Sequence, residues 1–440
     1  VYIPLSDRFT EDSRTEGKGD LMFILSINAS DTSGGAARAA YRLHLALLRE
    51  GIDSRMLVQR KFSDDVTVSG PQTRLQKAVS RLRSHLDALP VRSYKERKKT
   101  LFSPARLPFS GFAERINAMR PDIVHLHWIC GGILRFEDLA KIKAPIVWSL
   151  HDMWAFTGGC HYDQECGRYT TSCGRCVVLG SGREHDLSRK VFLRKQKTLQ
   201  RCKNLMINGL SGWLARCAQQ STLFKECHVV NLPNPIDTNL FKPVDKDFSR
   251  DLLNLPKNKK IILFGAMNAT GDPRKGFAEL SQALSMLQSA DVELVIFGSG
   301  KPLAPPDFGF PTHYLGHLSD DLSLKILYSA ADVMVVPSLQ ENLSNAIMES
   351  LACGTPVVGF NIGGNSDMID HKQNGYLAAP YEPSDLAAGI DWILTSPEYP
   401  LLCRNAREKV VREFDSSTVA SKYIDLYKRI LSERQRVATK

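Results

Sequence analysis

The sequence predicts an α/β protein built from parallel βαβ units in more than one domain. The stretch 332–360 is the clearest sign, because an apolar run at 332–336, a short helical segment at 346–353 and a second apolar run at 357–360 follow one another. Apolar runs of this kind are typical of strands that are buried on both faces of a parallel sheet. A chain of 440 residues is also long enough for two or three domains.

The composition indicates a globular protein that stays in the cytoplasm. Hydrophobic residues make up 43% of the chain and charged residues 24%, and residues 1–20 are too polar for a secretory signal. The chain contains no apolar run of the roughly 18 residues that a membrane-spanning helix needs. Met22 precedes the first apolar run and is a candidate natural first residue, so we treat residues 1–21 as an N-terminal extension.

The formal charge of +10 is concentrated in residues 74–106. We find no nucleic-acid motif, so phosphorylated substrates and an anionic membrane face are the partners to consider. One interpretation is a helix that lies on anionic lipid at the inner face of the cytoplasmic membrane, which would make the protein peripheral. The other is a helix packed on its own domain with a solvated basic face. The apolar positions are Leu75, Val79, Leu82, Leu86 and Leu89, and the basic ones include Arg74, Lys77, Arg81 and Arg83, then Lys95, Arg97, Lys98 and Lys99 after Pro90.

Two glutamates, Glu341 and Glu349, flank the start of the helix in the 332–360 unit. Glu341 follows the first strand at its carboxyl end, where open parallel sheets bind ligands. Glu349 lies about one turn inside the helix, whose first N–H groups are free to bind a phosphate. Two carboxylates that bind two hydroxyl-bearing groups, with a phosphate between them, match the layout of a nucleotide sugar. The alternative is two solvated glutamates near an ordinary helix start.

The spacing Glu341-x7-Glu349, followed by Ala-Cys-Gly-Thr-Pro-Val-Val, resembles the family 4 retaining glycosyltransferases of the GT-B fold. The resemblance implies two Rossmann-like α/β/α domains that face each other across a cleft. It also implies that Glu341 contacts the hydroxyls of the donor sugar and Glu349 those of the ribose. The donor would be a UDP- or GDP-sugar, and the residues between the two glutamates would line it: Asn342, Leu343, Ser344 and Asn345.

A cation is expected where the leaving nucleoside diphosphate gains negative charge, because a Lys or Arg there stabilises the transition state. Lys275, in an Arg-Lys-Gly sequence after the strand at 260–264, matches the catalytic lysine of the family. The family's arginine, about six residues earlier, is missing, since residues 266–269 read Ala-Met-Asn-Ala. Arg274 is a candidate substitute, and an ordinary surface arginine is the alternative.

The stretch 28–40 is a glycine-rich turn that leads from a first strand into a helix. It lacks the full G-x-G-x-x-G pattern and resembles the N-terminal glycine loop of the family instead. The resemblance implies that Gly34 and Gly35 face the donor diphosphate and the acceptor. A tight packing turn is the alternative.

Histidines follow two further strands. His151 comes directly after the apolar run at 146–150 and matches the strand-end histidine that approaches the transferred sugar in the family, so we expect it to be catalytic. His125 and His127 share one face of an earlier strand, and we expect both to be structural histidines with satisfied hydrogen bonds.

Four of the ten cysteines lie close together in the sequence. A Cys-x2-Cys pair with two more cysteines nearby, in a cytosolic protein, indicates a structural zinc site. The spacing departs from common zinc ribbons, so free or redox-paired thiols are an equal alternative. The four are Cys160, Cys166, Cys173 and Cys176.

The resemblance divides the chain after residue 21 into an acceptor-side domain at 22–231, a nucleotide-sugar domain at 232–415 and a helix at 416–440 that crosses back to the first domain. The combination of His-Asp-Met-Trp, Thr-Gly-Gly-Cys-His and Asp-Pro-Arg-Lys-Gly is similar to bacterial exopolysaccharide and O-antigen enzymes. That similarity implies transfer of a hexose to a hydroxyl of a glycan or lipid-linked oligosaccharide. The alternatives are a nucleotide-sugar epimerase of the same fold and a non-catalytic subunit that binds sugar nucleotides.

The stereochemistry follows from the roles that the resemblance implies. With Glu341, Glu349 and His151 engaged, no obvious carboxylate remains behind the anomeric carbon to serve as a nucleophile or strong base, which inverting transfer requires. We therefore predict retention of configuration, without a covalent sugar–enzyme intermediate. No Asp-x-Asp pair follows a strand, so we expect no metal or other cofactor to be required for catalysis.

Overall fold

The structure is a computed structural model that describes residues 21–108, 111–265, 272–289, 291–301, 305–318 and 320–438. Residues 1–20 of the expected N-terminal extension lie outside the described residues. So does the stretch 266–271, which contains the positions where the family's arginine is missing.

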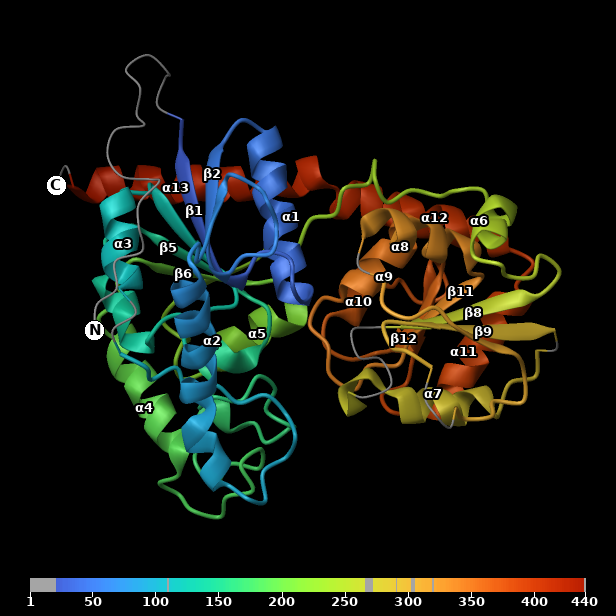
Figure 1. Ribbon diagram of the computed structural model, residues 1–440, viewed down its shortest axis with the longest axis horizontal. Coiled ribbons are helices and arrows are strands. Elements are labelled where there is room, and N and C mark those ends of the chain that lie inside the picture. The colour runs from blue at the N-terminus through green and yellow to red at the C-terminus, as the bar shows by residue number, and fades with distance from the viewer. Residues whose placement is uncertain are drawn as a thin grey trace. The chain divides into compact units, whose positions relative to one another are not determined.

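The chain divides into two compact units, each with its own parallel sheet (Figure 1). The first unit comprises the residues up to Asn234 together with those from Ala420 onward, and the second comprises Pro235–Val419. These boundaries fall a few residues after those expected from the sequence. The last helix, α13 (Ser416–Ala438), begins in the second unit and continues in the first.

Within the described residues, the first unit has a seven-stranded parallel sheet in the order β3-β2-β1-β4-β5-β6-β7. The strand order reverses between β1 and β4, and ligands bind at such a switch point in open α/β sheets. The strands are β1 (Phe23–Ser30), β2 (Asp53–Arg60), β3 (Val68–Ser69), β4 (Ile123–Leu126), β5 (Ile146–Leu150), β6 (Leu205–Gly209) and β7 (His228–Asn231). The α-helices are α1 (Gly35–Arg49), α2 (Arg74–Ala88), α3 (Phe112–Met119), α4 (Leu187–Leu199) and α5 (Gly212–Gln220), and the 3-10 helices are η1 (Leu89–Ser93), η2 (Phe136–Lys141), η3 (Met153–Phe156) and η4 (Arg168–Thr170).

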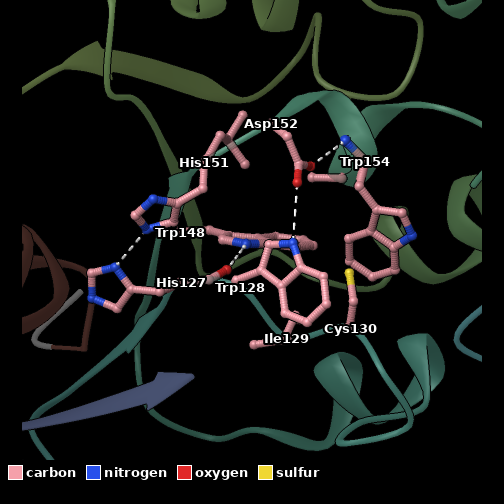
Figure 2. A pocket seen from close by; sticks show the side chains of 10 residues that line it. His127, Trp128, Ile129, Cys130, Trp148, His151, Asp152 and Trp154 are labelled. Atoms are coloured by element: carbon pink, nitrogen blue, oxygen red, sulfur yellow. Dashed lines mark hydrogen bonds between the residues drawn. The ribbon is translucent and has the colours of Figure 1, made fainter. Parts of the chain in front are cut away.

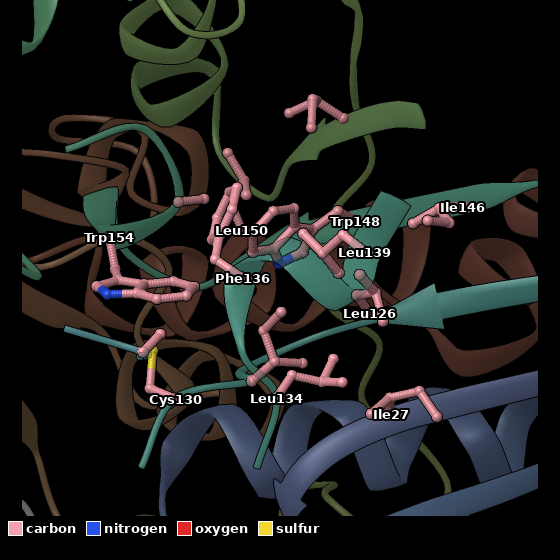
Figure 3. Packing of buried hydrophobic residues seen from close by; sticks show 14 of the residues in the cluster. Ile27, Leu126, Cys130, Leu134, Phe136, Leu139, Ile146, Trp148, Leu150 and Trp154 are labelled. Atoms are coloured by element: carbon pink, nitrogen blue, oxygen red, sulfur yellow. The ribbon is translucent and has the colours of Figure 1, made fainter. Parts of the chain in front are cut away.

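The two faces of this first sheet differ in chemistry. Leu126 and Trp148 point into a large apolar core (Figure 3). The alternate residue on β4, His125, points to the other face, because side chains alternate along a strand. There the Nδ1 atom of His125 lies 2.6 Å from the hydroxyl of Tyr427 on α13, and its Nε2 lies 2.8 Å from the hydroxyl of Ser149. Both ring nitrogens of His125 therefore have partners, as a structural histidine requires.

The second unit has a six-stranded parallel sheet among its described residues, in the order β10-β9-β8-β11-β12-β13. Its switch point lies between β8 and β11. The strands are β8 (Lys260–Gly265), β9 (Val292–Phe297), β10 (Thr312–Tyr314), β11 (Val333–Val336), β12 (Val357–Phe360) and β13 (Gly375–Ala378). The helices are α6 (Lys246–Leu252), η5 (Pro273–Lys275), α7 (Phe277–Leu284), α8 (Asp321–Ala330), α9 (Asn345–Ala352), α10 (Asn365–Met368), α11 (Pro383–Thr395) and α12 (Tyr399–Glu413).

The central strands of the second sheet, β9, β8, β11 and β12, are buried on both faces, which is why they are mostly apolar. On β8, Ile261 and Leu263 belong to one core cluster, whereas Ile262 and Phe264 belong to the other. Residues of α8, α9 and α12 complete the first cluster, and residues of α7 and α11 complete the second. This packing holds the carboxyl ends of β8 and β11 side by side, since the two strands pair in register.

Candidate functional site

The switch point of the second sheet brings together two residues that the sequence separates widely. Lys275 lies in η5 after β8, and Glu341 lies in the loop after β11. The Nζ atom of Lys275 donates a hydrogen bond to Oε2 of Glu341 at 2.9 Å. Both side chains remain partly exposed, at 26% for Lys275 and 15% for Glu341, so a ligand can reach them.

Backbone contacts explain why these two loops lie so close. Gly276 follows Lys275 with φ near 71°, and a Cβ atom at that position would overlap the carbonyl oxygen of Pro337. The amide of Leu339 donates to the carbonyl of Arg274 at 2.8 Å. Glycine is thus required at 276 both for its left-handed conformation and for this close approach.

The side chain of Arg274 is turned toward its own loop. Its Nη2 atom lies 2.6 Å from Oδ2 of Asp272, and its Nε lies 3.1 Å from Oδ1 of the same residue. Burial raises the pKa of Asp272, but the contacts with Arg274 outweigh burial and lower it overall. Asp272 therefore stays ionised and fixes the guanidinium, and the replacement of the missing arginine by Arg274 stays a prediction.

Helix α9 begins beside Glu341. Its N-cap residue, Ser344, makes no side-chain hydrogen bond to the helix start. The first N–H groups of an uncapped helix carry a partial positive charge and bind anions. The three residues that lead into the helix are buried and have little freedom to move: Asn342, Leu343 and Ser344. Asn345 is the first residue of α9 itself and is partly exposed.

Glu349 lies on the inner side of α9 and is only 3% exposed. The hydroxyl of Tyr328, on α8, donates to its Oε2 atom at 3.0 Å. The structure thus supplies a buried partner for a carboxylate that we expected to contact ribose. The sequence analysis did not identify Tyr328, and only its register on an amphipathic helix that precedes β11 hinted at its position.

In the first unit, His127 and His151 lie together after β4 and β5 (Figure 2). The Nδ1 atom of His127 lies 3.2 Å from Nε2 of His151. Burial lowers the pKa of His151 to about 4 and that of His127 well below its usual value, so both rings are neutral near pH 7. In a neutral pair of this kind, one ring can donate its N–H to the other, and the remaining ring nitrogens can contact a ligand.

His127 was expected to have satisfied hydrogen bonds, but among the described residues one of its ring nitrogens lacks a partner. Its side chain is 3% exposed, and its Nε2 atom has no hydrogen-bond partner among the described residues. Buried nitrogens are normally paired, so this one is a candidate contact for a ligand. The two histidines line a small pocket together with Trp128, Ile129, Cys130, Trp148, Leu150, Asp152, Trp154 and Ala155 (Figure 2).

Asp152 organises the turn that follows His151. It accepts hydrogen bonds from Nε1 of Trp128 at 3.1 Å and from the amide of Trp154 at 2.9 Å, and its Oδ2 lies 2.6 Å from Nδ1 of His161. Burial raises the pKa of Asp152, but contact with His161 and these hydrogen bonds lower it overall. The carboxylate thus fixes the tryptophans beside His151, which explains chemically the His-Asp-Met-Trp motif.

Comparison with known proteins identifies the family. A model described as "Glycosyl transferase 4-like domain" matches residues 34–198, and one described as "Glycosyl transferases group 1" matches residues 258–396. The chain belongs to the family 4 glycosyltransferases. The two matches fall one in each unit, and the second contains Lys275, Glu341 and Glu349.

Sequence relatives of this glycosyltransferase are distant. An uncharacterized glycosyltransferase of Methanocaldococcus jannaschii is 25% identical over 346 residues, which cover 70% of this chain and 83% of that protein. D-inositol 3-phosphate glycosyltransferase 2 of Catenulispora acidiphila is 28% identical over 221 residues, which cover 46% of this chain and 51% of the relative. The chain thus spans about half the length of that second relative.

Solved structures show that the glycosyltransferase has the GT-B fold, as predicted. Sucrose-phosphate synthase from Thermosynechococcus elongatus aligns with a TM-score of 0.67 at 19% identity and covers 94% of this chain and 100% of its own. Anabaena HepE, solved with UDP-glucose, aligns with a TM-score of 0.61 at 17% identity, covering 93% and 100%. WaaG, a glycosyltransferase involved in lipopolysaccharide biosynthesis, aligns at 0.59 and 15%, covering 92% and 99%.

The glycine turn of the first unit lies at the β1–β4 switch point of the glycosyltransferase. Gly34 caps α1 with φ near 102°, and a Cβ atom added there would contact nothing within 4 Å. Backbone conformation therefore requires glycine at 34, whereas close packing does not. Trp128 connects the two strand ends, because its amide donates to Oδ1 of Asn28 at 2.8 Å and its carbonyl accepts from Ala29 at 2.9 Å. The roles of Gly34 and Gly35 toward donor and acceptor stay predictions.

The four clustered cysteines all lie within the described residues. Across the described residues, which include all four, no group of three or more His, Cys, Asp or Glu side chains is arranged to hold a metal ion. Burial raises the pKa of each of the four thiols. Cys160 and Cys176 pack instead in a small apolar cluster, and zinc binding stays a prediction for metal analysis.

Proposed function

We propose that this glycosyltransferase transfers a sugar from a UDP- or GDP-sugar to a hydroxyl of a glycan, and that the second unit binds the donor. The pairing of Lys275 with Glu341 beside the uncapped start of α9 carries the proposal. A cation and a helix N-terminus suit a diphosphate, and a carboxylate suits the hydroxyls of a sugar. The solved complex of HepE with UDP-glucose, a protein of the same fold, supports a nucleotide-sugar donor.

The same residues suggest how the bond breaks. Charge develops on the diphosphate as the glycosidic bond lengthens, and Lys275 together with the start of α9 would stabilise it. Glu341, which otherwise pairs with Lys275, would then hold the sugar hydroxyls. We propose that the acceptor attacks from the leaving-group side and that a diphosphate oxygen takes its proton, which gives retention of configuration. In this proposal the neutral His151 contacts the transferred sugar and needs no change of charge.

A glycan or lipid-linked oligosaccharide in cell-surface polysaccharide synthesis is the acceptor class we propose. The sequence motifs that resemble exopolysaccharide and O-antigen enzymes support it, and so does the fold shared with WaaG, which acts in lipopolysaccharide biosynthesis. A transfer assay with a panel of glycan acceptors tests this class.

A panel of UDP- and GDP-sugars should be screened by thermal stabilisation, because a ligand that binds the native state raises the unfolding temperature. We expect one nucleotide series to stabilise the protein and Glu341→Gln to abolish the difference between the nucleotide sugar and the free nucleotide. Stabilisation by no nucleotide would contradict the proposal. Conversion of the donor without an acceptor would indicate an epimerase, and binding without release of diphosphate, whatever the acceptor, would indicate a non-catalytic subunit.

A further inference from the structure

Helix α2 turns its apolar side chains to solvent and its polar ones to the protein. Leu75 is 58% exposed and Leu82 is 55% exposed, whereas Gln76, Ser80 and Asp87 are buried. Surface helices of soluble proteins show the reverse arrangement. Val79, Leu86 and Leu89 are exposed on the same side. The alternative of an apolar face packed on its own domain is therefore wrong for this helix.

Hydrogen bonds, and not leucine packing, hold α2 in place. The buried carboxylate of Asp87 accepts from the amides of Ala105 at 3.2 Å and Arg106 at 3.0 Å. The hydroxyl of Ser80 donates to the carbonyl of Gln59 at 2.7 Å. Because these polar contacts position the helix, its apolar stripe is left available for a partner outside the described residues. Figure 1 shows α2 in the foreground of the first unit.

Exposed basic residues lie on α2 outside the apolar stripe and in the segment that follows the helix. At 100° per residue, Arg74 and Arg81 lie about 110° to 130° from the middle of the apolar stripe, and Lys77 lies nearly opposite it. Within residues 74–100, all of which the structure describes, Glu96 is the only exposed acid. The exposed Lys and Arg residues of this range are Arg74, Lys77, Arg81, Arg92, Lys95, Arg97, Lys98 and Lys99.

We propose that α2 and the basic segment after it form a docking surface for a lipid bilayer rich in acidic phospholipid. An apolar stripe that enters the boundary between headgroups and acyl chains, flanked by lysines and arginines, is the pattern of an interfacial helix. The charge decides between occupants. A symmetric dimer through the same face would bring together two surfaces that each carry eight exposed Lys and Arg residues and one exposed acid within residues 74–100, and these would repel, whereas acidic headgroups neutralise this charge. The inference does not depend on the proposed sugar transfer.

Sedimentation of the full chain with vesicles tests the inference. We expect binding to vesicles of equimolar phosphatidylglycerol and phosphatidylcholine, little binding to pure phosphatidylcholine, and weaker binding at high salt. Each basic residue near an acidic surface is worth about fivefold in binding, so Arg74→Gln with Arg81→Gln should reduce it roughly 25-fold. Leu75→Gln with Leu82→Gln and Leu86→Gln should reduce binding roughly tenfold or more.

Matched controls separate docking from a general effect of surface changes. Phe248→Gln with Leu252→Gln removes exposed apolar side chains from α6, and Lys422→Gln with Lys428→Gln and Arg429→Gln removes exposed charge from α13. Both should bind vesicles like the parent. The unfolding temperature of the leucine variant should stay unchanged, since these side chains are exposed.

Equal binding to both vesicle types, no binding, or a leucine variant that binds normally would overturn the inference. If the parent does not bind vesicles but forms a dimer that the leucine variant cannot form, the face would belong to a second copy of the chain.

Discussion

Lys275 and Glu341 form an ion pair, so a donor that binds both of them has to replace part of that contact. The two glutamates are expected to contact different parts of the donor, Glu349 the ribose and Glu341 the sugar. Glu349→Ala should weaken both free UDP or GDP and the nucleotide sugar, because ribose is common to them. Glu341→Ala should weaken only the nucleotide sugar. A lost hydrogen bond to a charged group costs roughly 1.5 to 3 kcal/mol. Titration calorimetry measures this, and equal losses for both ligands in both variants would refute the assignment.

Lys275 can be tested through turnover. Lys275→Ala should lower kcat about 10² to 10³-fold, because the charge on the leaving diphosphate loses its cation. The far-UV spectrum should stay unchanged, since the side chain is partly exposed. Lys257→Ala is a suitable control, because that lysine forms an exposed ion pair with Asp251 on the same unit. A Lys275→Ala variant that turns over like the parent would show that the ion pair is only structural.

His127 offers a further residue-level test. In His127→Asn, the shorter amide can keep a hydrogen-bond partner for His151 but leaves no group at the position of the unpaired Nε2. In His127→Gln, the longer side chain places its amide near that position. If the nitrogen binds a ligand, the Asn variant should lose about tenfold in kcat, which is the worth of one hydrogen bond, and the Gln variant should recover part of it. Nucleotide affinity should not change in either. Steady-state kinetics decides this, and equal activity of parent and Asn variant would make His127 structural.

Among single residues, those within a sequence motif could be predicted, whereas those that matter through contact with another residue could not. Glu341 and Lys275 were found from their motifs, and the structure places them in contact. Tyr328 could not be found, because only the packing of α8 against α9 brings it to Glu349. For His127, the strand pattern showed its face but not that one nitrogen would lack a partner.

The loop that carries Lys275 is the element on which the site depends most. Gly276→Ala should destabilise the second unit, because the residue has a left-handed conformation and its Cβ would overlap Pro337. We expect a loss of roughly 1 to 3 kcal/mol and weaker nucleotide binding. Gly182→Ala is the control, since a Cβ there meets nothing within 4 Å and the backbone is not left-handed. Urea unfolding of both variants checks this, and equal stability would contradict the role of the turn.

Elements with strong local signals could be predicted. The strands β8 and β11 and the helix α9 were expected close to their observed bounds, because their apolar runs end at glycine or proline. The orientation of α2 could not, since periodicity shows that a helix has an apolar face but not which face the protein covers. In α2, buried hydrogen bonds at Ser80 and Asp87 decide the orientation.

On the scale of the whole molecule, buried neutral histidines make the first unit sensitive to acid. Burial lowers the pKa of His44 to about 4 and that of His125 to about 3, from a usual 6.5. Between pH 6.5 and these lowered pKa values, the two histidines bind more protons in the unfolded chain than in the folded one. The folded state therefore keeps the full contribution of these histidines to stability above pH 6.5 and loses it as the pH falls. Each histidine contributes a slope of up to about 1.4 kcal/mol per pH unit.

Urea unfolding at pH 7 and pH 5, followed by tryptophan fluorescence, measures this dependence. Four of the five tryptophans lie in the first unit, so the signal mainly reports on it: Trp128, Trp148, Trp154 and Trp213. We expect lower stability at pH 5, and His44→Asn should reduce the difference. Equal stability at both pH values would show that these histidines are not neutral in the folded state.

The α/β class and the GT-B fold were predicted correctly, because both sheets repeat the βαβ pattern and the second carries a specific motif. Membrane contact was left open by the sequence. No helix among the described residues is long and apolar enough to span a bilayer. The exposed leucines of α2, seen only in the structure, turn that open question into a testable surface.

The anomeric configuration of the first product tests the central claim most directly. The protein should be incubated with an α-linked nucleotide-sugar donor selected by thermal stabilisation and a panel of glycan acceptors, and the new linkage read by proton NMR. If the acceptor attacks from the leaving-group side, assisted by Lys275 and the start of α9, the product should have an α linkage. A β linkage would require a base on the opposite face and would contradict both the mechanism and the roles given to Glu341 and Lys275.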